Sequence, residues 1–472
     1  MGKEREIVNR NRIVLTLIIA SVLVMALGIQ SAICQVPGSN PGNVPLTKVT
    51  LGSIVPQDTE TGKVSLSTDG LGVYPGTSGT IQVQKPSASA TVRKAFMVAA
   101  TTGFTGYKLA AGDIKIDGSN FVWSIETSSS IGSWNYWGEV TNIVKSKIDA
   151  APVGRVDFTI TESNTGPIDG ELLAVIFDDP SQATDNTVVL LFGAQDIAGD
   201  TFHIGLASPL TADNLAHPLD MSLGISYSYQ IGSQQYSIVN VNGQRMTTSA
   251  GGEDDGDHTN GALFTVGGLD DSDANPANPL ALPNGNWRYD DELYNLNPFV
   301  NVGDTTINVF TQNPSTDDNI FFAALNLQAT TAVVGEGVVL APATATNIVG
   351  TSHTVTATLQ DTNGNPIVGR TVTFTVTSGP NTGTTGTATT DANGHASFTY
   401  TGLIPGDDTI MASFVNNVGQ TVNSNVVTKK WEGISNQIPE VPLGTIVGFA
   451  VMALAAPAYF GVSKARSRRI KL

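Results

Sequence analysis

Short strand-like runs separated by turn residues fill most of this 472-residue chain. Such runs lie at residues 80–83, 94–99, 156–161, 172–177, 188–192, 236–241 and 306–310. They are rich in β-branched and aromatic residues and are bounded by Gly, Asn, Asp or Pro. No stretch keeps helical periodicity for long, and residues 140–148 are the one helical candidate. The sequence therefore predicts an all-β fold.

Residues 46–328 form one long block of such runs. Several alternate apolar with polar side chains, as strands with one buried face do. The runs at 172–177 and 188–192 are continuously apolar, which is typical of central strands covered on both faces. This distal block is long enough for one large β-sandwich or for two smaller sandwiches in series, and the sequence does not choose between them.

Residues 330–430 have a cleaner strand pattern. Val355, Ala357 and Leu359 alternate with threonines, and the same alternation recurs at residues 371–376. Asn363-Gly364 and a second Asn-Gly pair at 393–394 supply the positive φ angles that a tight hairpin turn needs. Together with Gly369-x-x-Val-Thr-Phe and Gly406-Asp-Asp-Thr-Ile, these residues resemble bacterial Ig-like domains of the intimin and invasin group. The resemblance implies an immunoglobulin-like β-sandwich that acts as a spacer and has no catalytic site.

The two ends of the chain predict export and anchoring. Residues 1–34 have the layout of a signal peptide: four cations, an apolar run over 13–27, and small or polar residues after it. An uncleaved anchor is the alternative. Residues 441–462 are uncharged and long enough to span a membrane, and residues 463–472 carry five cations, typical of a cytoplasmic tail. Residues 35–45 and 431–440 are predicted linkers.

Two further resemblances concern the origin of the chain. Parts of the distal block, such as Phe177-Asp-Asp-Pro180 and Tyr289-Asp-Asp-Glu292, resemble an uncharacterised exported domain of archaeal and some bacterial surface proteins. Pro439-Glu-Val-Pro-Leu-Gly444 resembles archaeal C-terminal anchor or sorting segments. These resemblances imply an archaeal-type surface protein whose anchor is either kept or exchanged by a sorting enzyme.

The net charge argues against a nucleic acid partner, and the cysteine content argues against disulfides and cysteine-ligated metals. Nine of the 24 cations lie in the terminal segments, which leaves 15 against 39 carboxylates and a net charge of about −24 for the exported part. Such a surface repels nucleic acid. The single cysteine, Cys34, lies at the expected cleavage region, so the body has neither a disulfide framework nor a cysteine-ligated metal.

One acidic segment is a candidate calcium site. Clustered carboxylates are the hard oxygen ligands that Ca²⁺ prefers. The candidate ligands are Glu253, Asp254, Asp255, Asp257, Asp271 and Asp273. Their spacing does not fit an EF-hand, so a solvated acidic loop without metal is the alternative. Ca²⁺ is the one cofactor that the sequence suggests.

A group of aromatic residues is a candidate ligand site. Trp134, Tyr136 and Trp137 lie close together in the sequence, and aromatic rings of this kind stack on sugars. The alternative is that they fill the core of the distal block. The histidines are scattered, and neither a His-Glu-x-x-His motif nor a Gly-x-Ser-x-Gly motif occurs.

We therefore expect a non-enzymatic, membrane-anchored cell-surface protein. Its role would be adhesion or cell-envelope structure, through contact with a surface glycan or protein and with no nucleic acid partner. The alternative is a carbohydrate-binding or carbohydrate-active surface protein that acts through the distal block.

Overall fold

The computed structural model describes residues 47–48, 53–228, 237–251, 255–256, 263–273, 292–416 and 421–433. The chain divides into two compact units, residues 1–47 and 48–472, and the fold below is that of the second. The predicted signal segment and the predicted span at 441–462 lie outside the described residues. Within the described ranges, no helix is long and apolar enough to cross a membrane.

Strands dominate both modules, as the sequence predicts. In the distal block they are β1 (Thr47–Lys48), β2 (Ile54–Gly62), β3 (Val64–Leu71), β4 (Ser78–Lys85), β5 (Thr91–Thr101), β6 (Ile114–Ile116), β7 (Ile125–Ser128), β8 (Trp134–Glu139), β9 (Gly154–Glu162), β10 (Ile168–Asp178), β11 (Asn186–Gly193), β12 (Asp200–Leu206), β13 (Leu219–Ser226), β14 (Ser237–Val241), β15 (Gln244–Ala250), β16 (Phe264–Val266), β17 (Leu293–Asn295), β18 (Thr306–Gln312), β19 (Asn319–Leu327) and β20 (Ala332–Val334). Within the ranges given above, the helical elements are α2 (Thr141–Ala150) and the short 3-10 turns η1 (Asn214–Ala216) and η3 (Asn297–Phe299). The helix predicted at 140–148 is thus confirmed.

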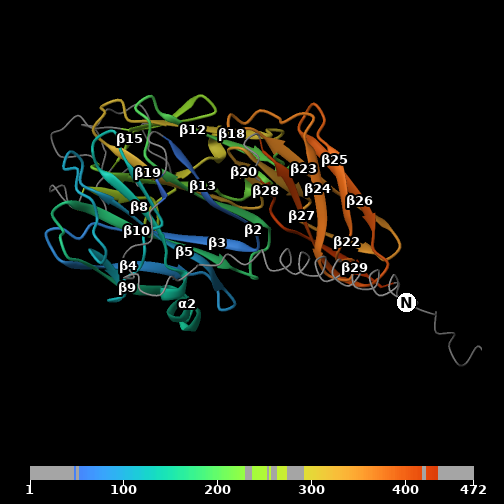
Figure 1. Ribbon diagram of the computed structural model, residues 1–472, viewed down its shortest axis with the longest axis horizontal. Coiled ribbons are helices and arrows are strands. Elements are labelled where there is room, and N and C mark those ends of the chain that lie inside the picture. Colours follow the sequence, from blue (N-terminus) through green and yellow to red (C-terminus); the bar gives the residue numbers. More distant parts are fainter. Residues whose placement is uncertain are drawn as a thin grey trace, which may run out of the picture. The chain divides into compact units, whose positions relative to one another are not determined.

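The distal strands form four sheets that we name by one strand each. The β9 sheet has the order β4-β9-β6, and the β10 sheet contains β7-β8-β5-β10-β3. The β11 sheet has the order β16-β13-β19-β11-β2, with β17 beside β13, and the β18 sheet has the order β15-β14-β18-β12-β20. Figure 1 shows the four sheets following one another, from β4 and β9 on one side to β12 and β18 on the other.

The four sheets are stacked face to face. One apolar cluster packs the β10 sheet on the β11 sheet through side chains such as Leu172 and Val188. A second cluster packs the β11 sheet on the β18 sheet through side chains such as Val189 and Val309. The outer β9 sheet and α2 cover the remaining face of the β10 sheet, and every residue of β11 is buried. The expected choice between one sandwich and two in series is replaced by a continuous stack with two inner sheets.

The two continuously apolar runs lie in these inner sheets. The run at 172–177 lies in β10, and the run at 188–192 lies in β11. The prediction that both are covered on two faces is confirmed. Odd and even positions of each strand pack on different neighbouring layers, so alternation is lost from the sequence.

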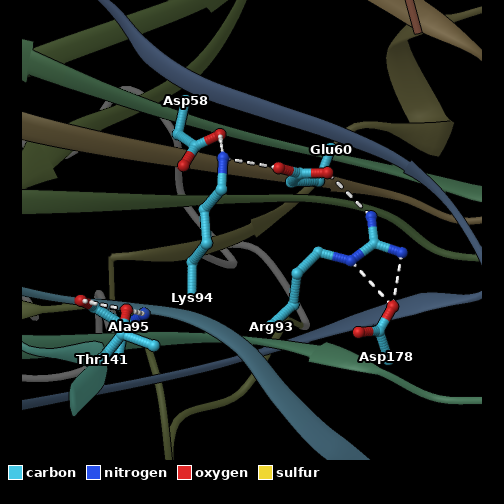
Figure 2. A network of polar contacts seen from close by, with 7 residues as sticks. All are labelled: Asp58, Glu60, Arg93, Lys94, Ala95, Thr141 and Asp178. Atoms are coloured by element: carbon cyan, nitrogen blue, oxygen red, sulfur yellow. Dashed lines mark hydrogen bonds and ion pairs between the residues drawn. The ribbon is translucent and has the colours of Figure 1, made fainter. Parts of the chain in front are cut away.

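An ion-pair network joins the two inner sheets at one edge (Figure 2). The guanidinium of Arg93 on β5 donates to Glu60 Oε2 at 2.7 Å and to Asp178 Oδ1 at 2.6 Å. The Lys94 ammonium lies 2.6 Å from Glu60 Oε1 and 2.9 Å from Asp58 Oδ1. Burial raises the pKa of Asp58, and its contact with Lys94 opposes that rise. Glu60 therefore links β2 of one inner sheet to β5 of the other.

The second module is an Ig-like sandwich. Its strands are β21 (Gly337–Ala341), β22 (Thr344–Ile348), β23 (Ser352–Gln360), β24 (Thr371–Ser378), β25 (Thr385–Thr389), β26 (His395–Thr401), β27 (Gly406–Val415), β28 (Thr421–Asn423) and β29 (Val427–Glu432). One sheet has the order β21-β23-β26, and the other has β22-β29-β27-β24-β25, with β28 beside β27. The predicted apolar positions Val355, Ala357 and Leu359 are all buried, and both Asn-Gly turns place glycine at positive φ.

One buried acid organises the centre of this sandwich. Asp408 is completely buried and accepts hydrogen bonds from Trp431 Nε1 at 2.8 Å and from the Tyr400 hydroxyl at 3.0 Å. The backbone and side-chain nitrogens of Asn381 donate to the same carboxylate. Because each oxygen has a donor, this carboxylate is satisfied inside an apolar core.

The junction between the modules lies further along the chain than the sequence pattern places it. Strand β20 falls within the predicted Ig-like region, yet it pairs with β12 of the β18 sheet. The Gln360 amide then donates to the carbonyl oxygens of Gly335 at 2.8 Å and His203 at 3.1 Å. The amide of one Ig-like strand thus satisfies backbone carbonyls of both β12 and the connecting segment.

Close packing of the inner sheets generates the first prediction. A Cβ added at Gly170 on β10 would lie 2.5 Å from the Leu71 carbonyl oxygen and 2.7 Å from Phe264 Cγ. Overpacking of this kind costs about 1–3 kcal/mol. We expect Gly170→Ala to lower the free energy of unfolding by that amount in urea titrations.

The matched control is Gly166→Ala, because no atom lies within 4 Å of a Cβ added there. This substitution should change the free energy of unfolding by less than about 0.5 kcal/mol. Equal stability of the two variants would contradict the packing described for β10.

Candidate functional site

The described part of the acidic segment does not converge on one point. Glu253, Asp254 and Asp257 lie outside the described residues. The Asp255 carboxylate accepts a hydrogen bond from the Val266 backbone nitrogen at 2.5 Å, and the Asp271 carboxylate accepts one from the Gly268 nitrogen at 2.6 Å. Asp255 therefore binds the end of β16, and Asp271 supports a local backbone turn. The predicted calcium site stays a prediction.

Two further acids of this region, Asp270 and Asp273, interact with charged groups nearby. Asp273 is exposed. The pKa of Asp220 is raised to about 7, first by the burial of Asp220 itself and then by the negative charge of Asp273. The Arg155 guanidinium donates to Asp270 at 2.6 Å, and this contact lowers the pKa of the Asp270 carboxyl. Across the described ranges, no group of three or more His, Cys, Asp or Glu side chains is arranged to hold a metal ion.

The three candidate ligand-binding rings lie on β8, and two of them are in the core. Tyr136 is fully buried, and its hydroxyl accepts a hydrogen bond from the Leu109 nitrogen at 3.0 Å. Trp137 is 4% exposed and packs on Phe96, with ring centroids 4.6 Å apart. Their position favours the alternative reading, in which these rings fill the core.

Trp134 is the member of the group that reaches the surface. Its ring is partly exposed, and the Lys108 ammonium lies 3.5 Å from the ring centroid. Lys108 also forms an ion pair with Glu126 at 3.0 Å. A ligand that stacked on this face of Trp134 would have to displace a cation–π contact.

A cavity of about 620 Å³ is lined mainly by polar side chains. Its charged lining residues are paired with one another: Lys63 lies 3.3 Å from Asp185, and Arg93 lies 2.7 Å from Glu60. General acid–base chemistry needs a titratable group with an open position toward substrate. The charged side chains that line this cavity are therefore engaged in ion pairs with one another.

The sequence does not show that three acids of the distal block are buried close to one another. Glu162, Asp169 and Glu171 are 4%, 0% and 0% exposed. Glu162 ends β9, and the two other acids lie on β10, where Asp169 binds the Tyr227 nitrogen. Burial raises the pKa of Asp169 to about 7. Burial also raises the pKa of both glutamates, and the pKa of Glu162 is raised further by its neighbour Glu171.

The sequence contains a signal for this group. Glu162 continues the inward-facing series Val156, Phe158 and Ile160 at the expected two-residue interval. Glu171 directly precedes an apolar run. An acid in register with buried apolar positions is a candidate for a shifted pKa.

Comparisons with known proteins identify one module. Residues 339–427 match the family model of the bacterial Ig-like domain (group 1). This finding confirms the Ig-like module that the sequence resemblance predicts. No curated protein sequence is significantly similar to the chain.

Solved structures give weak likenesses only. A protein from Corynebacterium diphtheriae whose name describes it as membrane anchored has 10% identity and a TM-score of 0.19, over 82% of this chain and 61% of that one. Red sea bream transglutaminase has 10% identity and a TM-score of 0.16, over 52% and 29%. Domains 1–6 of the surface layer protein SbsC have 11% identity and a TM-score of 0.15, over 79% and 54%. The chain thus spans less than two thirds of each, and at these TM-scores the likeness carries no argument.

The burial of the rings generates the second prediction. Trp137→Ala removes a core side chain and should lower the free energy of unfolding by about 3–5 kcal/mol. Trp134→Ala removes a partly exposed ring and one cation–π contact, so it should cost about 1 kcal/mol or less. Chemical denaturation of the two variants measures this difference. A larger loss for Trp134→Ala would overturn the placement of the rings.

Proposed function

We propose that this chain is a non-enzymatic, membrane-anchored cell-surface protein with a role in adhesion or cell-envelope structure. In this proposal residues 1–34 direct export, residues 441–462 cross the membrane, and the basic tail stays in the cytoplasm. The Ig-like module is the spacer that holds the distal block away from the membrane, as in the intimin and invasin group, on an archaeal-type surface protein.

The observation that carries the proposal is the bacterial Ig-like domain at 339–427, which precedes an apolar segment followed by five cations. The net negative charge of the preceding body is compatible with an exported protein that does not bind nucleic acid. A partner would be a glycan or protein on the envelope or on a neighbouring cell.

The arrangement of the distal block supports a role without catalysis. Its stacked sheets are closed by apolar clusters, Tyr136 and Trp137 are buried, and the charged groups of the cavity described above are paired. Trp134 is the aromatic group through which the carbohydrate-binding alternative would act, because its ring is partly exposed.

The topology generates the third prediction. We place one epitope tag after Gln35 and another after Leu472 and add protease to intact cells that carry the full chain. The first tag should be removed and the second should survive, because only the second lies behind the membrane in this proposal. Survival of both tags on intact cells, with loss of both after lysis, would contradict it.

The adhesive role is tested on the same cells. Cells that display the full chain should bind an array of envelope glycans or neighbouring cells more strongly than cells without it, and Trp134→Ala tests whether the exposed ring takes part. Loss of binding in EDTA would support a calcium contribution. Absence of binding with correct topology would favour the structural role over adhesion.

A further inference from the structure

The clearest chemical anomaly of the fold is a pair of glutamates between two sheets. Glu162 ends β9 on the face that packs against the β10 sheet, and Glu171 lies on β10. Their side chains lie within hydrogen-bonding reach of each other. The pair therefore bridges the outer sheet and an inner sheet of the distal block.

Neither glutamate has a hydrogen-bond donor among the described residues. All four carboxyl oxygens are buried and without a partner. The cross-strand neighbours of Glu171 are Leu71 and Ala99, and the neighbour of Glu162 is Ile114. A buried carboxylate without a donor or cation costs several kcal/mol, so two ionised carboxylates at this place are strongly disfavoured.

The surrounding titratable groups do not supply a counter-charge. Asp169 lies two residues before Glu171 on β10, and it accepts a hydrogen bond from the Tyr227 nitrogen at 2.8 Å. Asp69 faces the same layer from β3 and accepts from the Gln82 nitrogen. Both are acids, so their ionisation would add repulsion.

The other charged groups of this layer form hydrogen bonds with groups other than the two glutamates. Asp113, next to β6, accepts hydrogen bonds from Tyr107 at 2.7 Å and Ser163 at 2.8 Å. The buried ammonium of Lys85 on β4 donates to the carbonyl oxygens of Asp149 and Ala151. The residues of β5 that face this layer are apolar: Ala95, Met97 and Ala99.

We propose that Glu162 and Glu171 share one proton and form a carboxyl–carboxylate hydrogen bond that joins the β9 and β10 sheets and makes the distal block more stable in acid than in alkali. Burial raises the pKa of both groups, and the charge of Glu171 raises the pKa of Glu162 further, while the hydrogen bond with Glu162 lowers the pKa of Glu171. One proton held between the two carboxyls accounts for both directions. The pair resembles the dyads in which two adjacent carboxyls cannot both ionise.

The sign of the pH dependence follows from the proton count. At neutral pH both glutamates are ionised in the unfolded chain, while the folded pair keeps one proton, so folding takes up a proton. Stability then falls as pH rises above about 4.5, the ordinary pKa of a glutamate, and continues to fall until the folded pair loses its proton. One proton corresponds to roughly 2–4 °C in Tm per pH unit.

A bound cation is the alternative for two facing carboxylates. The described residues contain no three-acid group arranged for a metal, whereas a shared proton needs only the observed hydrogen-bonding reach. The two explanations predict opposite effects of an amide in place of one acid. A glutamine is neutral at every pH and removes a metal ligand.

The test compares the full chain with Glu171→Gln and Glu162→Gln by calorimetry in detergent between pH 5 and pH 9. A shared proton predicts that each variant unfolds at higher Tm than the parent at pH 8, with a Tm slope smaller by roughly 2–4 °C per pH unit. The surface variant Glu139→Gln on β8 is the control for loss of one charge and should keep the parent slope. The Ig-like module, which lacks the pair, is an internal control.

A spectroscopic measurement separates the shared proton from general effects on stability. The infrared carbonyl band of a protonated carboxyl group should be present in the parent at pH 7 and lose intensity in both glutamine variants. Unchanged bands and unchanged Tm slopes in the variants would overturn the proposal. So would a Tm of the parent that rises with added Ca²⁺ and falls in EDTA, together with destabilisation by Glu171→Gln, because that result assigns the pair to a cation.

Discussion

The structure depends on one constraint: two sheets of the distal block have no face toward water. Each side chain of β10 and β11 must fit between neighbouring layers, so these strands carry continuous apolar runs and glycines at close approaches such as Gly170. At the rim, Arg93 binds Glu60 and Lys94 binds Asp58. Polar groups inside are costly unless they are paired, because the interior does not solvate them.

The same constraint bears on function. Three acids with a raised pKa, Glu162, Asp169 and Glu171, are buried in this block, whereas Asp220 is partly exposed. The rings of Tyr136 and Trp137 likewise fill a core. A contact with another surface is therefore left to exposed loops and to partly exposed groups such as Trp134. This distribution is compatible with the proposal above, in which the Ig-like module displays the distal block.

Local structure could be predicted from the sequence where the signal is local. The seven strand-like runs fall on strands, and α2 lies where apolar spacing predicts it. The Asn-Gly pairs of the Ig-like module form turns, with glycine at positive φ. Each of these features depends mainly on residues that are close in the sequence. The order of the layers could not be predicted, because the pairing of β11 with β19 joins residues more than a hundred positions apart. For the same reason β20 was assigned to the wrong side of the junction by its sequence pattern alone.

The contacts of the acidic residues could not be predicted, for a related reason. The calcium site at residues 253–273 stays a prediction, because three of its six acids lie outside the described residues; of the others, Asp255 and Asp271 bind different backbone nitrogens. The glutamates that do meet, Glu162 and Glu171, come from strands in different layers. Only the stacking of the sheets brings them together, and no pattern within one strand encodes that contact.

Hydrogen exchange of the full chain tests the stacked arrangement most directly, because amides shielded on both faces exchange only when the whole block unfolds. We expect amides of β10 and β11 to be the last of the distal block to exchange, well after those of the short outer strand β6. Exchange of β10 or β11 at the rate of β6 would show that these strands are exposed and would contradict the stacked arrangement.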